Sequence, residues 1–222
     1  MKLSSLQQES IMRHLELILV ENKKLNLTRI SDQAQAEILH IEDSLVAIEE
    51  LNDAPEGLYA DLGTGAGYPG IPLSIVSGRK TTLVDSVQKK ALVLSEIIET
   101  LGLTDQISVY PGRIEDFSKD QPLLYSAITA RALTSLPSLL ELASPLLRTK
   151  GHLICYKARL HEEELKHAQS LKEVLGLQYK SDRKVILSDG ITLRRIVVFE
   201  KIAPAKVKLP RKIGLAQKRP LV

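Results

Sequence analysis

The chain has 222 residues, of which 44% are hydrophobic and 26% are charged, and its net charge is +3. This composition indicates a globular protein with one large domain, or one domain with an appendage. No apolar run is long enough to span a membrane, and the single cysteine, Cys155, excludes an intrachain disulfide. Because the N-terminus also has no secretory signal, we expect a cytoplasmic protein.

Two amphipathic helices are predicted ahead of the main domain. The first covers residues 5–24, and a second that begins at Ser31-Asp32 completes a helical extension over residues 1–52. His40 and Asp43 lie three residues apart on the second helix. Packing is the simpler interpretation of His40, and the alternative is that both residues frame a ligand site. No second histidine lies at a metal-binding spacing nearby, so we expect no metal.

A glycine-rich loop after the first predicted strand is the most informative stretch of the chain. The apolar run 57–62 contains Asp61 near its end and leads into Gly63, Gly65 and Gly67. Glycines allow positive φ and a close approach of the backbone to a ligand. A strand followed by such a loop and by a helix, here starting near Pro69, is typical of a nucleotide or cofactor site.

The loop satisfies two cofactor patterns at once. Residues 65–70 match the G-x-G-x-x-G dinucleotide pattern, and Asp85 follows at about the expected distance. However, the carboxylate of Asp61 would gain nothing beside a pyrophosphate, whereas it would form a charge-assisted hydrogen bond with a cationic amine. S-adenosylmethionine carries such an amine and no phosphate. We therefore favour a methyltransferase, and an NAD(P)-dependent oxidoreductase remains the alternative.

Strands and helices alternate through residues 53–201, the predicted main domain. After the first strand, further strands are predicted at 81–84, 107–110, 126–130, 151–156, 184–187 and 193–199. Helices are predicted at 87–102, 137–147 and 160–174. Asp189-Gly190 joins the last two strands as a hairpin. This order predicts an α/β fold, a Rossmann-like doubly wound sheet that is mostly parallel and ends in an antiparallel hairpin.

Each of the first four strands ends in polar residues, and ligands of such sheets bind beyond the carboxyl ends of the strands. Asp85-Ser86 follows the second strand, where a carboxylate suits the two hydroxyls of a ribose. Ile114-Glu115 follows the third and suits the face and edge of an adenine. Arg131 ends the fourth. Four polar strand ends together favour a ligand site over four unrelated solvated loops.

The chain resembles the bacterial 16S ribosomal RNA guanine-N7 methyltransferases, the small-subunit methyltransferase G family also called glucose-inhibited division protein B. The similar segments are Asn26-Leu27-Thr28, His40-Ile41-Glu42-Asp43-Ser44, residues 61–73, Asp85-Ser86, Arg113-Ile114-Glu115, Thr129-Ala130-Arg131-Ala132, Tyr156-Lys157 and the basic C-terminus. The resemblance implies a class I S-adenosylmethionine-dependent methyltransferase fold. It implies methyl transfer to N7 of the guanine at position 527, in the 530 loop of 16S rRNA, with free 16S rRNA or the 30S subunit as partner.

The resemblance also implies roles for particular residues. It implies that Gly63 and Tyr68 contact S-adenosylmethionine, that Asp85-Ser86 binds the ribose and Ile114-Glu115 the adenine, and that Arg131 lies in the site. To these cofactor-binding residues the loop itself adds Asp61 and Gly65. A non-catalytic RNA-binding protein of ribosome assembly with the same fold is a further alternative.

Guanine N7 already presents a lone pair, so its methylation needs positioning rather than a general base. Arg131 is our candidate catalytic residue, because a guanidinium can hold guanine O6 or a phosphate, although a structural ion pair would explain it as well. A carbon-5 pyrimidine methyltransferase would need a cysteine nucleophile. Cys155 lies in an apolar strand and is interpreted as a core residue.

The C-terminal end is strongly basic. Seven of the 30 basic residues and no acid lie in residues 201–222, which leaves 23 basic against 27 acidic side chains in the rest. We predict that residues 202–222 form an extended, mobile arm that binds RNA phosphates, although a merely solubilising tail is the alternative. The predicted RNA-binding residues are Lys157, Arg211, Lys212, Lys218 and Arg219. We expect the protein to be a monomer.

Overall fold

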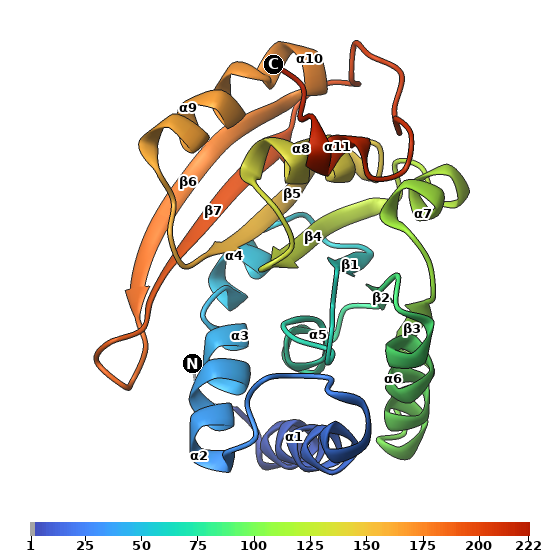
Figure 1. Cartoon of the computed structure of the whole chain (residues 1–222), viewed down its shortest axis with the longest axis vertical. Coiled ribbons are helices and arrows are strands. Elements are labelled where there is room, and N and C mark those ends of the chain that lie inside the picture. Colours follow the sequence, from blue (N-terminus) through green and yellow to red (C-terminus); the bar gives the residue numbers. More distant parts are fainter. Residues whose placement is uncertain (1–2) are drawn as a thin grey trace.

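The computed structural model describes residues 3–222, in which seven strands form one sheet between two layers of helices (Figure 1). The strand order is β3-β2-β1-β4-β5-β7-β6, with β1 to β5 parallel and β7 antiparallel to both neighbours. The strands are β1 (Tyr59–Leu62), β2 (Thr81–Val84), β3 (Ile107–Tyr110), β4 (Tyr125–Arg131), β5 (Leu147–Lys157), β6 (Leu177–Ile186) and β7 (Leu193–Lys201). The predicted mostly parallel sheet with an antiparallel C-terminal hairpin is confirmed.

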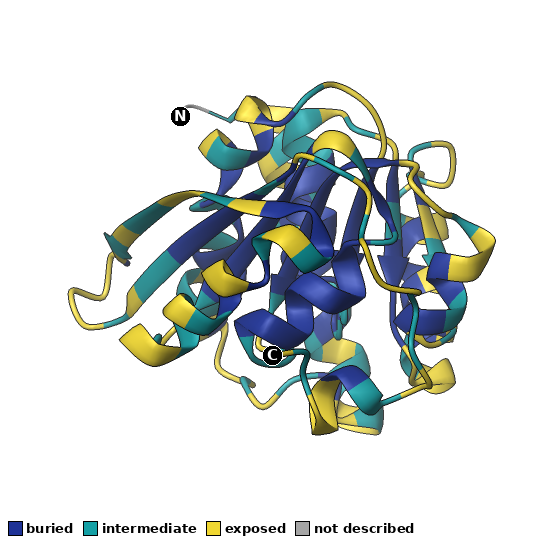
Figure 2. Ribbon diagram, turned by 90° about the horizontal axis from the view of Figure 1, so that it is seen from above, coloured by how far each residue is buried: buried dark blue, intermediate teal, exposed yellow. Residues whose placement is uncertain are grey.

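The helices divide between the two faces of the sheet. On one face lie α1 (Ser5–Leu25), α2 (Gln33–Ala36), η1 (Glu37–Glu42), α3 (Asp43–Leu45), α4 (Ile48–Asp53), α5 (Gly70–Ser77) and α6 (Gln88–Thr100). On the other lie α7 (Ile114–Asp120), α8 (Leu136–Ala143), α9 (Glu162–Ser170), α10 (Lys172–Leu175) and α11 (Leu215–Lys218). Figure 2 shows the buried strands between these layers and the exposed outer sides of the helices. Within residues 3–222, no helix is long and apolar enough to span a bilayer.

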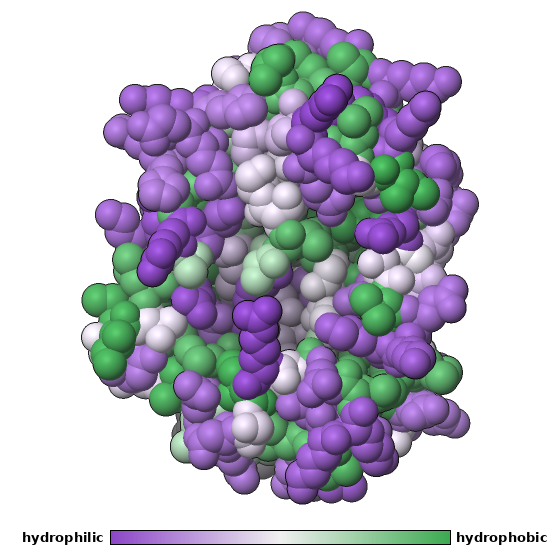
Figure 3. Space-filling model, in the orientation of Figure 1, coloured by the Kyte–Doolittle hydropathy of each residue, from purple (hydrophilic) through white to green (hydrophobic). Residues whose placement is uncertain are grey.

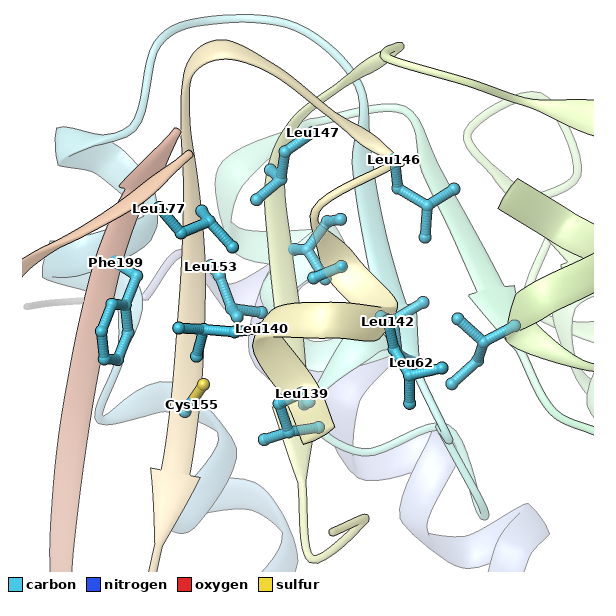
Figure 4. Packing of buried hydrophobic residues seen from close by; sticks show 14 of the residues in the cluster. Leu62, Leu139, Leu140, Leu142, Leu146, Leu147, Leu153, Cys155, Leu177 and Phe199 are labelled. Carbon is cyan, nitrogen blue, oxygen red and sulfur yellow. The ribbon is translucent and has the colours of Figure 1, made fainter. Parts of the chain in front are cut away.

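The short helix α8 is the centre of the larger core cluster. Its leucines, among them Leu139, Leu140 and Leu142, are buried against Leu153 of β5 and the strands β6 and β7 (Figure 4). Cys155 belongs to the same cluster, and burial raises the pKa of its thiol to about 12. A thiol in this environment is protonated and inert at neutral pH. The interpretation of Cys155 as a core residue is confirmed.

The N-terminal region matches the prediction only in part. α1 begins with a capping box, in which the Ser4 hydroxyl accepts from the backbone N–H of Gln7 and the Gln7 side chain accepts from the backbone of Ser4. The second predicted helix does begin after Asp32, whose carboxylate accepts from the backbone N–H of Gln35. It is not one helix, however, because a π-helical segment, η1, interrupts it and α4 begins anew at Ile48.

Three further elements differ from the prediction. The helix predicted over 137–147 ends at Ala143, because the chain turns there and Leu147 already pairs with Tyr125. β6 begins at Leu177, well before the predicted start at 184. Helix α7 was not predicted. The segments α7 and β6 contain few apolar residues among many polar ones, so neither segment has a clear hydrophobic period.

The C-terminal segment, residues 202–222, contradicts the prediction of an extended, mobile arm. It folds back over α8, forms the short helix α11 and buries Ala216. Arg211, one of the predicted RNA-binding residues, forms an ion pair with the buried Glu141. Lys212, Lys218 and Arg219 remain exposed. The expectation was wrong because charge and prolines indicate solvation but do not reveal a specific partner on the folded body.

Candidate active site

The glycine loop crosses the carboxyl ends of β1 and β2. Gly63, Gly65 and Gly67 all have positive φ, of 71°, 61° and 86°, a conformation that glycine adopts at no steric cost. The backbone N–H of Gly63 donates to the carbonyl of Val84 at 2.8 Å, which ties the loop to the end of β2. A Cβ at Gly65 would meet no atom within 4 Å, so the backbone there faces open space.

Asp61 anchors this loop to the body of the protein. It is fully buried, its Oδ2 accepts from the N–H of Gly70 at 3.0 Å, and its Oδ1 accepts from the Thr129 hydroxyl at 2.7 Å. Burial raises the pKa of its carboxyl, and the hydrogen bonds oppose that rise. Both oxygens therefore help to hold the loop to α5 and β4, and the expected contact with a cofactor amine stays a prediction.

A first cavity, of about 220 Å³, lies beyond the loop at the ends of β1, β2 and β3. Six of the predicted cofactor residues line it, namely Gly63, Gly65, Asp85, Ser86, Ile114 and Glu115. Asp85 is oriented by two backbone donors, since its Oδ2 accepts from Gly65 at 2.9 Å and its Oδ1 from Val87 at 2.8 Å. Carboxylates together with the apolar Ile114 and Leu133 suit the hydroxyls and the ring of a nucleoside. These residues fit an adenosine-containing cofactor.

A second cavity, of about 440 Å³, lies beside the first. Ala132 lines the second cavity and its neighbour Leu133 lines the first, so the chain after β4 separates them. The second cavity is lined by Ile30, Leu39, His40, Asp43, Arg131, Ala132, Thr134, Leu139, Tyr156, Lys157, Ala158, Arg159 and Arg194. Figure 3 shows that hydrophilic side chains dominate the face seen there and that its centre is hollowed. Basic groups on apolar walls suit an anionic or purine ligand.

Asp43 bridges two arginines at the wall of the second cavity. Its Oδ2 is 2.8 Å from Nη1 of Arg131, and its Oδ1 is 2.7 Å from Nε of Arg194. Arg131 Nη1 also donates to the carbonyl of Leu39 at 3.0 Å. His40 and Asp43 therefore do frame a cavity, the sharper of the two interpretations. Arg131 lines the second cavity and not the first, its assignment to the cofactor stays a prediction, and the anticipated ion pair is present.

Tyr68 follows Gly67 of the glycine loop, is buried and lines neither cavity, and its predicted contact with the cofactor stays a prediction. Its ring stacks on His40 with centroids 4.5 Å apart and lies 4.6 Å from His14. Burial lowers the pKa of His14 to about 3 and that of His40 to about 4. Both rings are thus neutral at pH 7. His14 contacts the loop directly, through its Nε2 and the Ala66 carbonyl at 3.1 Å.

The other predicted residues also have protein partners. Lys157 Nζ lies 2.8 Å from Oε1 of Glu164, on the wall of the second cavity. Glu115 Oε1 accepts from the N–H of Gly214 at 2.7 Å. Several lining residues were not predicted, among them Leu133, Arg194 and Gln217. These three come from a loop, from β7 and from the C-terminal segment, and none lies in a recognisable motif.

Comparisons with known proteins agree with this geometry. The sequence profile of the family described as rRNA small subunit methyltransferase G matches residues 7–213. The chain is 37% identical to ribosomal RNA small subunit methyltransferase G of Chloroflexus aggregans, covering 99% of this chain and 92% of that protein. It is 33% identical to the protein of the same name from Alkaliphilus metalliredigens, covering 97% and 91%.

Among solved structures, a geranyl diphosphate methyltransferase in complex with S-adenosylmethionine superposes with a TM-score of 0.58 at 12% identity, covering 72% of this chain and 85% of that one. At this identity the likeness concerns the fold alone, and it confirms the class I S-adenosylmethionine-dependent methyltransferase fold. Because the family profile and the relatives cover nearly the whole chain, the protein belongs to the rRNA small subunit methyltransferase G family.

Proposed function

We propose that the protein transfers a methyl group from S-adenosylmethionine to N7 of the guanine at position 527 in the 530 loop of 16S rRNA. One observation carries the proposal beyond family membership. Two cavities of different chemistry adjoin at the carboxyl ends of the parallel strands, separated only by the Ala132-Leu133 segment. The first suits the adenosine of the cofactor, and the second, with its arginines, suits a purine and its phosphates.

The reaction requires the protein to position guanine N7 against the methyl group. S-adenosylmethionine supplies an electrophilic methyl group when it is bound, and guanine N7 carries its own lone pair, so no proton has to be removed. In this proposal Asp85 binds the ribose hydroxyls. Arg131 is held by Asp43 and offers its remaining N–H donors to guanine O6 or to a phosphate. The role of Arg131 is to hold the base in line with the methyl group.

The proposal predicts that a strain without this gene lacks N7-methylguanosine at position 527 of its 16S rRNA. Mass spectrometry of nuclease fragments that contain the 530 loop measures the modification directly. Wild-type protein supplied from a plasmid is expected to restore the methyl group. Complete modification in the deletion strain would refute the activity and leave the protein as an RNA-binding member of the fold.

Asp85→Ala is expected to weaken binding of S-adenosylhomocysteine roughly 10- to 100-fold, because hydrogen bonds to a charged group contribute about 1.5–3 kcal/mol. Isothermal titration calorimetry measures the affinity. Asp105→Ala, which removes an exposed carboxylate outside both cavities, is the matched control and is expected to bind as the wild type does. NAD in place of S-adenosylhomocysteine is expected to give no heat of binding. Binding of NAD alone would favour the oxidoreductase alternative.

A further inference from the structure

We propose that the C-terminal segment is part of the cofactor site, with Gln217 contacting the adenine of the cofactor and Arg211 acting as a positioning residue. This inference rests on the proposed function, since it takes the first cavity as the cofactor site. It assigns to the basic segment a role other than the RNA contact expected from its charge.

The segment is fastened to the body by a buried ion pair. Arg211 binds Glu141 of α8 through two parallel contacts, Nε to Oε1 and Nη2 to Oε2, each 2.6 Å long. The Glu141 side chain is only 2% exposed. Arg211 Nη2 also donates to the carbonyl of Arg219 at 2.6 Å, which joins the two ends of the turn that contains α11. Bidentate pairs of this kind fix orientation as well as position.

Within that turn, two further hydrogen bonds seat the backbone beside the first cavity. The Ser138 hydroxyl of α8 donates to the carbonyl of Ala216 at 2.8 Å, and Ala216 itself is buried. The N–H of Gly214 donates to Glu115 Oε1 at 2.7 Å, so the segment also orients a carboxylate of the cavity wall. Gln217 follows Ala216 directly and lines the same cavity as Ile114 and Glu115.

The chemistry of Gln217 suits adenine in particular. A carboxamide offers a donor and an acceptor side by side, and the adenine edges pair an N–H₂ donor with a ring-nitrogen acceptor. At the edge that contains N6 and N7 of adenine, hypoxanthine has an oxygen in place of the amino group and so presents two acceptors, and a carboxamide bound there would lose one of the two hydrogen bonds. The Gln217 side chain is exposed in this structure, so replacing it does not disturb the core. Its substitution therefore isolates contact with the ligand from folding.

The first test compares S-adenosylhomocysteine with S-inosylhomocysteine by isothermal titration calorimetry. The wild type is expected to prefer the adenine form. Gln217→Ala is expected to bind S-adenosylhomocysteine roughly 5- to 100-fold more weakly, the worth of two neutral hydrogen bonds, and to lose most of the preference. Gln169→Ala, an exposed glutamine of α9 outside the cavity, is the control and is expected to match the wild type.

The second test addresses Arg211 through the same preference. Arg211→Met is expected to reduce both the affinity for S-adenosylhomocysteine and the preference for adenine, because Gln217 is no longer held at the cavity. Arg211→Lys keeps the charge and one contact to Glu141, and is expected to restore part of the preference. A merely structural role of Arg211 would lower thermal stability in both variants without changing the ratio of the two affinities.

The outcomes separate this inference from the proposed function. If Gln217→Ala keeps wild-type affinity and preference while Asp85→Ala loses binding, the cofactor site stands and the role of the C-terminal segment is refuted. If the wild type does not bind S-adenosylhomocysteine, the proposed cofactor site is refuted and this inference with it.

Discussion

Replacing Asp43 with alanine is expected to lower the free energy of unfolding by about 3–5 kcal/mol, the cost of removing one partner from a buried charge cluster. The Asp43 side chain is 2% exposed and is the shared partner of Arg131 and Arg194, which are themselves only 16% and 18% exposed. Without it, two guanidinium groups face each other across the wall of the second cavity. Urea denaturation at pH 7 measures the loss.

A matched aspartate shows what burial contributes. Asp116 also lies 2.8 Å from a cation, Lys119, but its side chain is 43% exposed and that of Lys119 is 57% exposed. Asp116→Ala is expected to change the free energy of unfolding by less than about 1 kcal/mol, because exposed pairs are hydrated and screened. Equal losses in the two variants would show that the charge cluster at Asp43 is not what stabilises this wall.

Acidification from pH 7 to pH 5 is expected to destabilise the protein through its buried histidines. Above pH 6.5 the imidazoles are neutral in both states. Below it the unfolded chain binds protons, whereas folded His14, with its pKa lowered to about 3, and His40, lowered to about 4, do not. The folded state therefore loses stability as the pH falls, by about 2 kcal/mol for each histidine at pH 5. Burial and the nearby Lys180 also lower the pKa of His152, which adds to the slope.

A histidine variant isolates one contribution to that slope. His14→Gln can keep a hydrogen bond to the Ala66 carbonyl but cannot titrate. Its free energy of unfolding, measured with urea at intervals between pH 7 and pH 5, is expected to fall by about 2 kcal/mol less than that of the wild type. His161→Gln, at an exposed histidine, is the control. An unchanged slope in His14→Gln would contradict the assignment of acid sensitivity to this residue.

The parallel sheet was predictable because its strands are short apolar runs that end in polar residues. The short runs that form β1, β2 and β3 are clear in the sequence, and the predicted bounds of all three strands lie within two residues of the observed ones. The interruption of the second helix by η1 was not predictable in this way. Its apolar spacing fits a continuous helix, and η1 lies where His40 makes tertiary contacts with Tyr68 and Thr28, which the spacing does not reveal.

The candidate site also has features that the sequence predicts and features that it does not. Six of the predicted cofactor residues lie at strand ends or in the glycine loop, where fold topology alone brings them to one cavity. The same pattern of a glycine loop and polar strand ends contains Asp61, Tyr68 and Arg131. The side chain of each of these residues has a partner in the protein that the sequence does not reveal. The direction of each of these side chains depends on neighbours distant in the chain, such as Thr129, His40 and Asp43.

The walls of the first cavity extend from Gly63 to Gln217, so they come from segments far apart in the sequence. Folding during synthesis proceeds from the N-terminal side, so a segment that is made later joins a structure that is already partly formed. The sheet and α8 can thus form while Glu141 and Glu115 still lack Arg211 and Gly214. This cavity therefore becomes complete only when the segment that carries Gln217 has been made and has folded onto α8.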